Sequence, residues 1–120
     1  MKADTGASKN FVREQDAGHL KNVSTLKNGP KAKFPNSDLI QAQRHDYLPF
    51  QKYLSPEATE ALIFPNLTNA SLLSIGQLCD DNCTAIFTKE ALKIYKNNKV
   101  IIKGYRNYTD GLWDVKFNQQ

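Results

Sequence analysis

The sequence predicts a single all-β domain with one short helix and a C-terminal β-meander. Three observations lead to this prediction. The length of 120 residues suits one hydrophobic core and is too short for two. The composition, 40% apolar and 23% charged, is typical of globular proteins. In the second half of the chain, short apolar and β-branched runs alternate with turn signals, a pattern that indicates consecutive antiparallel strands.

The first half contains one hairpin signal and one helix signal. Residues 11–33 are rich in Lys, Asn and Gly, which predicts a loop-rich segment. Lys33-Phe34 and Leu39-Ile40 flank Pro35-Asn36-Ser37-Asp38, a turn-forming tetrad that indicates a β-hairpin. Ser55 followed by Pro56 is typical of a helix start, so we expect a helical turn through Glu60 and then a strand over 61–64.

The second half begins with a strand that runs into a short helix, at residues 72–78, where the apolar spacing changes. The meander follows, with expected strands at 84–88, 92–96, 100–103 and 112–117. Asn97-Asn98 and Asp110-Gly111 are expected to form its turns. Trp113, in the last of these strands, is expected in the core.

Charge and cysteine content restrict the partners. The net charge of +4 suits a nucleic-acid partner, although an excess of Lys is also a common solubility feature. No apolar run has the length of a membrane span and no secretory signal is present, so we expect an intracellular, cytoplasmic protein without a membrane partner. Cys79 and Cys83 form at most half of a zinc site. We therefore expect no metal and no cofactor, and buried free thiols.

The motif that indicates chemistry is Asp4-Thr5-Gly6-Ala7-Ser8. A carboxylate at the tip of a turn, a glycine that permits close approach and a hydroxyl that braces the loop are what a water-activating aspartate requires. One carboxylate is not sufficient, because amide hydrolysis by this route needs two that share a proton. A second Asp-Ser/Thr-Gly triplet does not occur in the chain. The second aspartate is therefore expected from another copy, across a two-fold axis.

A longer segment makes the resemblance specific. Residues 62–78 read LIFPNLTNASLLSIGQL, which closely resembles the protease region of copia-type LTR retrotransposon Gag-Pol polyproteins: an apolar strand, Pro, Leu, polar residues, then Leu-Leu-Ser-Val-x-Gln-Leu. The resemblance implies a retropepsin-like small β-barrel that cleaves its own polyprotein as a homodimer, within virus-like particles. It also implies a protease region over residues 1–88, with residues 89–120 continuing the same domain toward the pre-integrase segment.

The resemblance also implies roles for individual residues. Asp4, Thr5 and Gly6 match the catalytic loop, and Ala7 matches the residue against which substrate lies. The hairpin tip, Pro35, Asn36 and Ser37, is similar in position to the flap that closes over substrate. An element that packs under the catalytic loop is matched by Leu72, Leu73 and Ser74.

Some features leave a second interpretation open. Asn10 stands where copia-type sequences often have His, Ser37 replaces a common Gly, and only three residues precede Asp4. The alternative is a truncated or degenerate remnant, a non-catalytic β-barrel spacer or a nucleic-acid or protein interaction module. Weak nucleic-acid binding is favoured by a Lys- and Tyr-rich set in the meander: Lys89, Lys93, Lys96, Lys99, Lys103, Arg106, Tyr95, Tyr105 and Tyr108. Solvated strand faces are the simpler explanation of the same set.

Overall fold

A computed structural model describes residues 1–34, 39–50, 53–65, 67 and 69–119. Within these residues the chain is built mainly of short strands. The strands are β1 (Lys2–Asp4), β2 (Asn10–Arg13), β3 (Ser24–Thr25), β4 (Lys31–Lys33), β5 (Leu39–Gln41), β6 (Arg44–Tyr47), β7 (Glu60–Phe64), β8 (Leu72–Ser74), β9 (Thr84–Phe87), β10 (Ala91–Lys96), β11 (Lys99–Arg106) and β12 (Trp113–Val115). The helices are the 3₁₀ helix η1 (Glu14–His19) and the α-helices α1 (Pro56–Thr59) and α2 (Ile75–Asp80).

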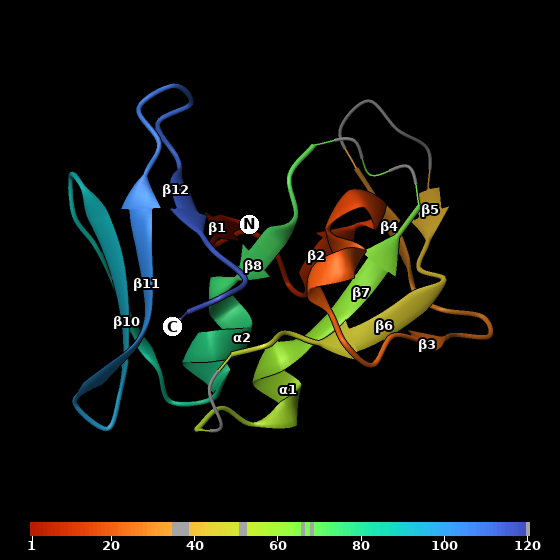
Figure 1. Cartoon of the computed structure of the whole chain (residues 1–120), viewed down its shortest axis with the longest axis horizontal. Coiled ribbons are helices and arrows are strands. Elements are labelled where there is room, and N and C mark those ends of the chain that lie inside the picture. The colour runs from red at the N-terminus through yellow and green to blue at the C-terminus, as the bar shows by residue number, and fades with distance from the viewer. Residues whose placement is uncertain (35–38, 51–52, 66, 68, 120) are drawn as a thin grey trace.

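One sheet of ten strands runs through the molecule in the order β3-β6-β7-β2-β8-β1-β12-β11-β10-β9. Most neighbours are antiparallel, but β2 pairs with β7 and β1 pairs with β8 in parallel. Figure 1 shows the meander on one side, β2, β6 and β7 on the other, and β1 with β8 between them. The two α-helices lie together below this central pair. The strand β1 therefore joins the two halves of the sheet.

The all-β prediction is confirmed at this coarse level, but the closed barrel is not found. Among the described residues the sheet has two free ends, β3 and β9, and β4 with β5 forms a separate two-stranded sheet. The two end strands do not pair with each other to close a barrel. β9 pairs with β10, and Figure 1 shows β10 and β3 at opposite ends of the molecule. The prediction of one helix is also wrong, since two short α-helices and a 3₁₀ helix are present. None of the helices in the described part of the chain is long and apolar enough to cross a membrane.

The local predictions for the helices and for the strands and turns from Ser55 onward are confirmed. Ser55 caps α1, its Oγ accepting from the Ala58 N–H at 3.2 Å, with Pro56 in the first turn. The segment at 72–78 is a strand followed directly by a helix. The meander strands β9 to β12 pair in sequence order, and Asn97 and Asn98 both have positive φ, as a tight hairpin turn requires. The predicted boundary at residue 88 lies in the connection between β9 and β10.

The predicted hairpin around the flap-like turn is confirmed in its strands. β4 and β5 pair antiparallel, with Lys33 opposite Leu39. The tip at 35–38 lies outside the described residues. The Ala42 N–H donates to the Pro30 carbonyl, which extends the β4–β5 pairing by one residue, and β6 then joins the main sheet beside β7.

Two apolar clusters hold the domain together. The larger one joins the meander, β7, β8 and the α-helices, with Ile63, Leu73, Leu78 and Ile94 at its fully buried centre. The smaller one lies under the β4–β5 hairpin and contains three phenylalanines whose ring centres are 5.1 to 5.4 Å apart in edge-to-face contacts: Phe11, Phe34 and Phe64. The hairpin is therefore attached through aromatic packing, although it is not part of the main sheet.

Gly104 is the position where the meander depends on a missing side chain. A Cβ at Gly104 would lie 2.6 Å from the Asp114 carbonyl oxygen and 3.0 Å from Val115. We expect Gly104→Ala to separate β11 from β12 and to reduce the free energy of unfolding by about 1–3 kcal/mol. Urea unfolding followed by circular dichroism measures this. Gly18→Ala is the control, because nothing lies within 4 Å of its added Cβ; equal effects of the two substitutions would contradict the steric argument.

Candidate active site at the end of β1

Asp4 is the last residue of β1, at the point where the strand becomes the Asp-Thr-Gly-Ala-Ser loop. Its backbone lies opposite Ser74 in the parallel β1–β8 pair. Its Oδ1 accepts a hydrogen bond from the Gly6 N–H at 2.7 Å. A Cβ at Gly6 would lie 3.3 Å from the same oxygen, so a larger residue would crowd the carboxylate. The loop thus orients the Asp4 side chain with its own backbone.

Ser74 attaches this loop to the helix that follows β8. Its Oγ donates to the Ala7 carbonyl at 2.7 Å and accepts from the Gln77 N–H at 3.1 Å, which makes it the N-cap of α2. One hydroxyl therefore begins a helix and holds the loop that carries Asp4 against it. The preceding Leu73 is fully buried in the main core.

Asn10 lies at the centre of a buried polar network below the loop, and its side chain is fully buried. Its Oδ1 accepts from the Ser74 N–H at 2.7 Å, while its Nδ2 donates to the carbonyls of Ala58 at 3.1 Å and Glu60 at 2.9 Å. An amide satisfies this arrangement because it carries an acceptor and two donors on one planar group. The residue that differs from the usual copia-type pattern is thus a structural connection between β2, β8 and α1.

Gln77 completes the network from the helix side. Its Oε1 accepts from the Asn10 N–H at 2.6 Å, and its Nε2 donates to the Glu57 carbonyl at 2.6 Å. Within the described residues, every buried side-chain nitrogen and oxygen has a hydrogen-bond partner. Sequence analysis missed the roles of Asn10 and Gln77, because the partners of Asn10 lie 48 to 67 residues away along the chain.

A groove of about 690 Å³ opens beside Asp4. Its lining is Lys2, Ala3, Asp4 and Thr5 from β1 and its loop, Asn69, Ala70 and Leu72 from the approach to β8, and Phe87, Asp110, Leu112 and Trp113 from the meander. Figure 1 shows the loops before β8 and before β12 rising on either side of β1. Most of the lining is apolar, so Asp4 is a carboxylate at the edge of a surface suited to apolar side chains.

One wall of the groove is held by an ion pair. The Arg13 guanidinium donates to both carboxylate oxygens of Asp16, at 3.0 and 3.1 Å, and to the Asn69 carbonyl at 2.9 Å. The Ser71 hydroxyl donates to Asp16 at 2.6 Å. Burial by itself raises the pKa of Asp16, but the hydrogen bonds from Arg13 and Ser71 outweigh it and leave that pKa below its ordinary value. The segment before β8 is therefore fixed to β2 and η1.

The opposite wall is held by Lys2. Its Nζ lies 2.6 Å from Asp110 and 2.5 Å from Asp114. Burial by itself lowers the pKa of Lys2, but the two carboxylates outweigh it and raise that pKa. The Lys2 hydrogen bond correspondingly lowers the pKa of Asp110. Asp110 is thus a second carboxylate that lines the groove, but it is held in its ionised form by a lysine.

The structure brings most of the predicted site residues together. Asp4, Thr5 and Leu72 line one groove, and Gly6 contacts the Asp4 carboxylate. Ala7 is buried with its carbonyl bonded to Ser74, so it faces the interior. The predicted substrate-binding residues Pro35, Asn36 and Ser37 lie outside the described residues.

Two expectations for other residues need correction. Trp113 does not lie in the core: it is half-buried and lines the groove, with its Nε1 donating to the Thr88 carbonyl at 3.0 Å and Arg106 stacked 4.6 Å from its ring centre. Both cysteines are free thiols, but only Cys83 is buried, because Cys79 lies on the outer side of α2.

The buried network gives the first prediction for this site. Asn10→Ala removes the partner of the Ser74 N–H and of two carbonyls in a space that water does not reach, so we expect a loss of about 2–4 kcal/mol in the free energy of unfolding. Chemical denaturation measures it. Asn22→Ala is the matched control, since Asn22 is exposed and its backbone bond to Asp46 survives the substitution. A loss below about 1 kcal/mol for Asn10→Ala would contradict the role assigned to the network.

Comparison of this chain with family models, with curated proteins and with solved structures gives no match. The resemblance to copia-type polyproteins therefore rests on the motifs in the sequence, and the chemistry of the site rests on the geometry around Asp4.

Proposed function

We propose that this chain is the retropepsin-like aspartic endopeptidase region of a retrotransposon polyprotein and that it cleaves its own polyprotein as a homodimer. The observation that carries the proposal is the placement of Asp4. It ends a strand, is oriented by the Gly6 N–H at 2.7 Å and opens into a groove lined by apolar side chains. These are the features that a water-activating carboxylate and an extended peptide need.

The proposed mechanism uses two copies of Asp4 that share one proton. The ionised carboxylate takes a proton from a water molecule, which attacks the scissile carbonyl, and the protonated one donates to the carbonyl oxygen. Two carboxylates at hydrogen-bond distance titrate with separated apparent pKa values, so one remains protonated at mildly acidic pH. Thr5 is exposed beside Asp4, and in the proposed dimer its hydroxyl braces the paired loops.

Asp110 is a poor substitute for the second Asp4. It lines the same groove, but Lys2 holds it as a carboxylate and its pKa is lowered, whereas the proton-donating member of the pair must keep its proton. A partner chain would supply an aspartate in the same loop and the same backbone environment. The symmetric arrangement is therefore the better explanation of the single Asp-Thr-Gly motif. In a polyprotein, the copies would meet where the element's products assemble, in virus-like particles inside the cell.

The substitution Asp4→Asn tests the mechanism directly. It keeps the shape of the side chain but removes the acid and base, so we expect cleavage of a peptide substrate at mildly acidic pH to fall by about 10³-fold or more. Asp80→Asn, the same change at an exposed carboxylate on α2, is the control and is expected to leave activity unchanged. Cleavage that survives Asp4→Asn would falsify the mechanism. Inactivity of the unmodified chain would favour the non-catalytic alternative.

The ion pairs of the domain determine how its stability changes at low pH. Asp16, Asp81 and Asp110 all have lowered pKa values; burial raises that of Asp81, but the hydrogen bond from Lys96 at 2.8 Å outweighs it. A carboxyl whose pKa is lower in the folded protein than in the unfolded chain stabilises the fold when pH is above its unfolded pKa of about 3.9. This stabilisation is lost as pH falls through the pKa of the folded state. We therefore expect the contribution of these three carboxylates to the unfolding midpoint in urea to be constant from about pH 7 to 5 and to fall below about pH 4.

The substitution Asp81→Asn supplies the comparison. It removes the negative charge that pairs with Lys96 and leaves only one amide oxygen to accept from Lys96 and the Ser55 N–H, so the variant should be less stable at neutral pH and should approach the unmodified chain at about pH 3. A difference between the two proteins that does not change with pH would show that Asp81 is not one of the groups responsible.

A further inference from the structure

The meander has an outer face that the proposed protease reaction does not use. In β9, β10 and β11 the side chains alternate, and the inward positions, such as Leu92, Ile94 and Ile102, are buried. On the outward side of the sheet, the strand register places Lys93 beside Ile86 and opposite Lys103. It also places Tyr95 opposite Val100. We define the meander face as Ile86, Lys93, Tyr95, Val100, Lys103 and Tyr105.

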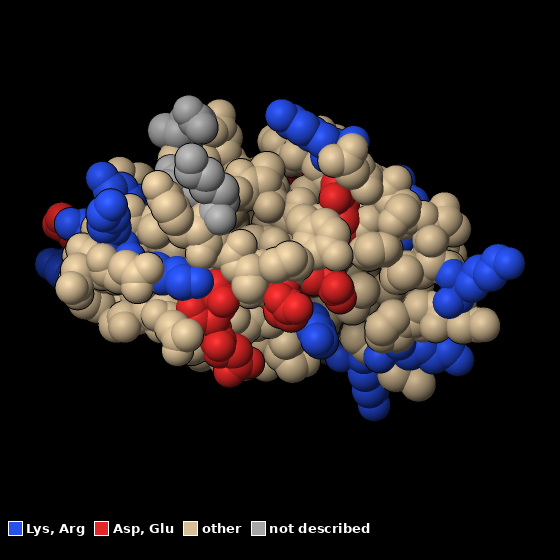
Figure 2. Space-filling view, turned by 90° about the horizontal axis from the view of Figure 1, so that it is seen from below, with Lys and Arg blue, Asp and Glu red and all other residues tan. Residues whose placement is uncertain are grey.

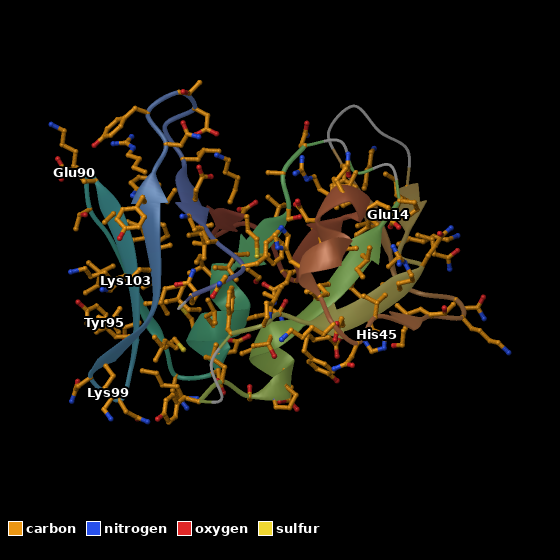
Figure 3. The ribbon with its side chains drawn as sticks, in the orientation of Figure 1. Glu14, His45, Glu90, Tyr95, Lys99 and Lys103 are labelled. Carbon is orange, nitrogen blue, oxygen red and sulfur yellow. The ribbon has the colours of Figure 1, made fainter. Side chains whose placement is uncertain are left out.

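The charge of the meander face is unbalanced. Lys93 and Lys103 occupy directly opposite positions of an antiparallel pair, an arrangement of like charges that destabilises a sheet. Among the ion pairs of the described residues, none involves Lys93, Lys99 or Lys103. Figure 3 shows Lys103, Tyr95 and Lys99 along the outer side of the meander, with Glu90 at its far end. Asp114 lies opposite Tyr105 but is paired with Lys2, so the cations of the face have no acidic partner among the described ion pairs.

The wider charge distribution agrees with this local pattern. On the side of the molecule seen in Figure 2, most of the Asp and Glu side chains gather near the middle, while Lys and Arg side chains are spread along the molecule and include both ends. Lys96 behaves differently from its neighbours, because its Nζ is bonded to Asp81 and to the Tyr53 carbonyl. Lys93 and Lys103 differ from Lys96 because they point away from the rest of the domain.

Exposed rings and aliphatic side chains accompany the lysines. Tyr105 is 66% exposed, Ile86 48% and Val100 38%, so the face carries accessible apolar surface beside its lysines. A shallow groove of about 620 Å³ continues from Val100, Lys103 and Tyr105 toward Lys116 and Gln119. The Tyr105 ring, Lys103 and Lys116 thus border one depression, which Asp114 also lines. A chain can follow these cations while flat groups lie on the ring.

We propose that the meander face binds single-stranded nucleic acid, the phosphates contacting Lys93, Lys103 and Lys116 and a base stacking on Tyr105. Phosphates between Lys93 and Lys103 relieve their repulsion, so charge complementarity selects a polyanion. The exposed ring selects a polyanion with unpaired bases, since stacking needs a base that is not already inside a duplex. The inference extends beyond the proposed protease function and uses none of the residues that define the end of β1.

The test is a fluorescence anisotropy titration of a labelled single-stranded RNA of about 20 nucleotides at several salt concentrations. We expect binding at low salt, with Lys93→Gln/Lys103→Gln weakening it roughly tenfold and reducing the slope of log K against log salt by about 1.4, because each phosphate of a single strand that a lysine neutralises accounts for about 0.7 of that slope. The matched control is Lys21→Gln/Lys27→Gln, which makes the same change in net charge at two exposed lysines outside the meander. Equal weakening of binding in both double variants would overturn the proposed site.

Tyr105 separates stacking from simple charge attraction. Tyr105→Leu should weaken binding by about 5- to 100-fold, and Tyr105→Phe should retain it, because the ring and not the hydroxyl makes the contact. Thermal unfolding of each variant confirms that it is folded, and Tyr105→Phe keeps the comparison valid if the leucine variant is not. Equal binding by the leucine variant, tighter binding of a duplex, or equal competition by poly-glutamate would each overturn the proposal. Asp4→Asn should bind RNA normally, which distinguishes failure of this inference from failure of the protease proposal.

Discussion

The hydrogen bonds of Asn10 are the interaction on which the rest of the structure depends. The two halves of the sheet meet where β2, β8 and β1 lie side by side, and only a few residues of each strand make that junction. Asn10 spans it by bonding to Ser74 on one side and to the carbonyls of Ala58 and Glu60 on the other. A fully satisfied polar group in a buried position specifies one arrangement, because any shift leaves it unpaired. The loop that carries Asp4 takes its position from the same junction, through Ser74 and Ala7.

Ion pairs extend this junction to the periphery. Lys2 joins β1 to the loop before β12, Arg13 with Asp16 joins β2 to the segment before β8, and Lys96 with Asp81 joins the meander to the α-helices. The Arg13–Asp16 and Lys96–Asp81 pairs are partly buried and make further hydrogen bonds to backbone or hydroxyl groups, which distinguishes them from an exposed pair of small net effect. The walls of the groove beside Asp4 are thus fixed by charge, while its lining is mostly apolar.

The sequence predicted the parts of the fold that depend on neighbouring residues. Ser55 with Pro56, the change of spacing after Ser74 and the turn at Asn97-Asn98 all act within a few residues, and each element formed where it was expected. The order of strands was not predictable in the same way. The parallel pairing of β1 with β8 joins residues about 70 positions apart, and nothing local in either strand specifies it. The bonds that Asn10 and Lys2 make were unpredictable for the same reason, and the open sheet replaced the expected barrel.

The alternation of side chains in β11 explains how one strand can serve two surfaces. Gly104 faces inward, where β12 approaches closely, while Lys103 and Tyr105 on either side of it face outward. The inward position is constrained by the Asp114 carbonyl, whereas the outward side chains are exposed. Substitutions on the outer side therefore change charge and stacking without altering the packing that holds β12 and, through Lys2, one wall of the groove. The meander face and the groove beside Asp4 are in this way separable within a single sheet, so that the effect of a substitution in either surface can be assigned to it.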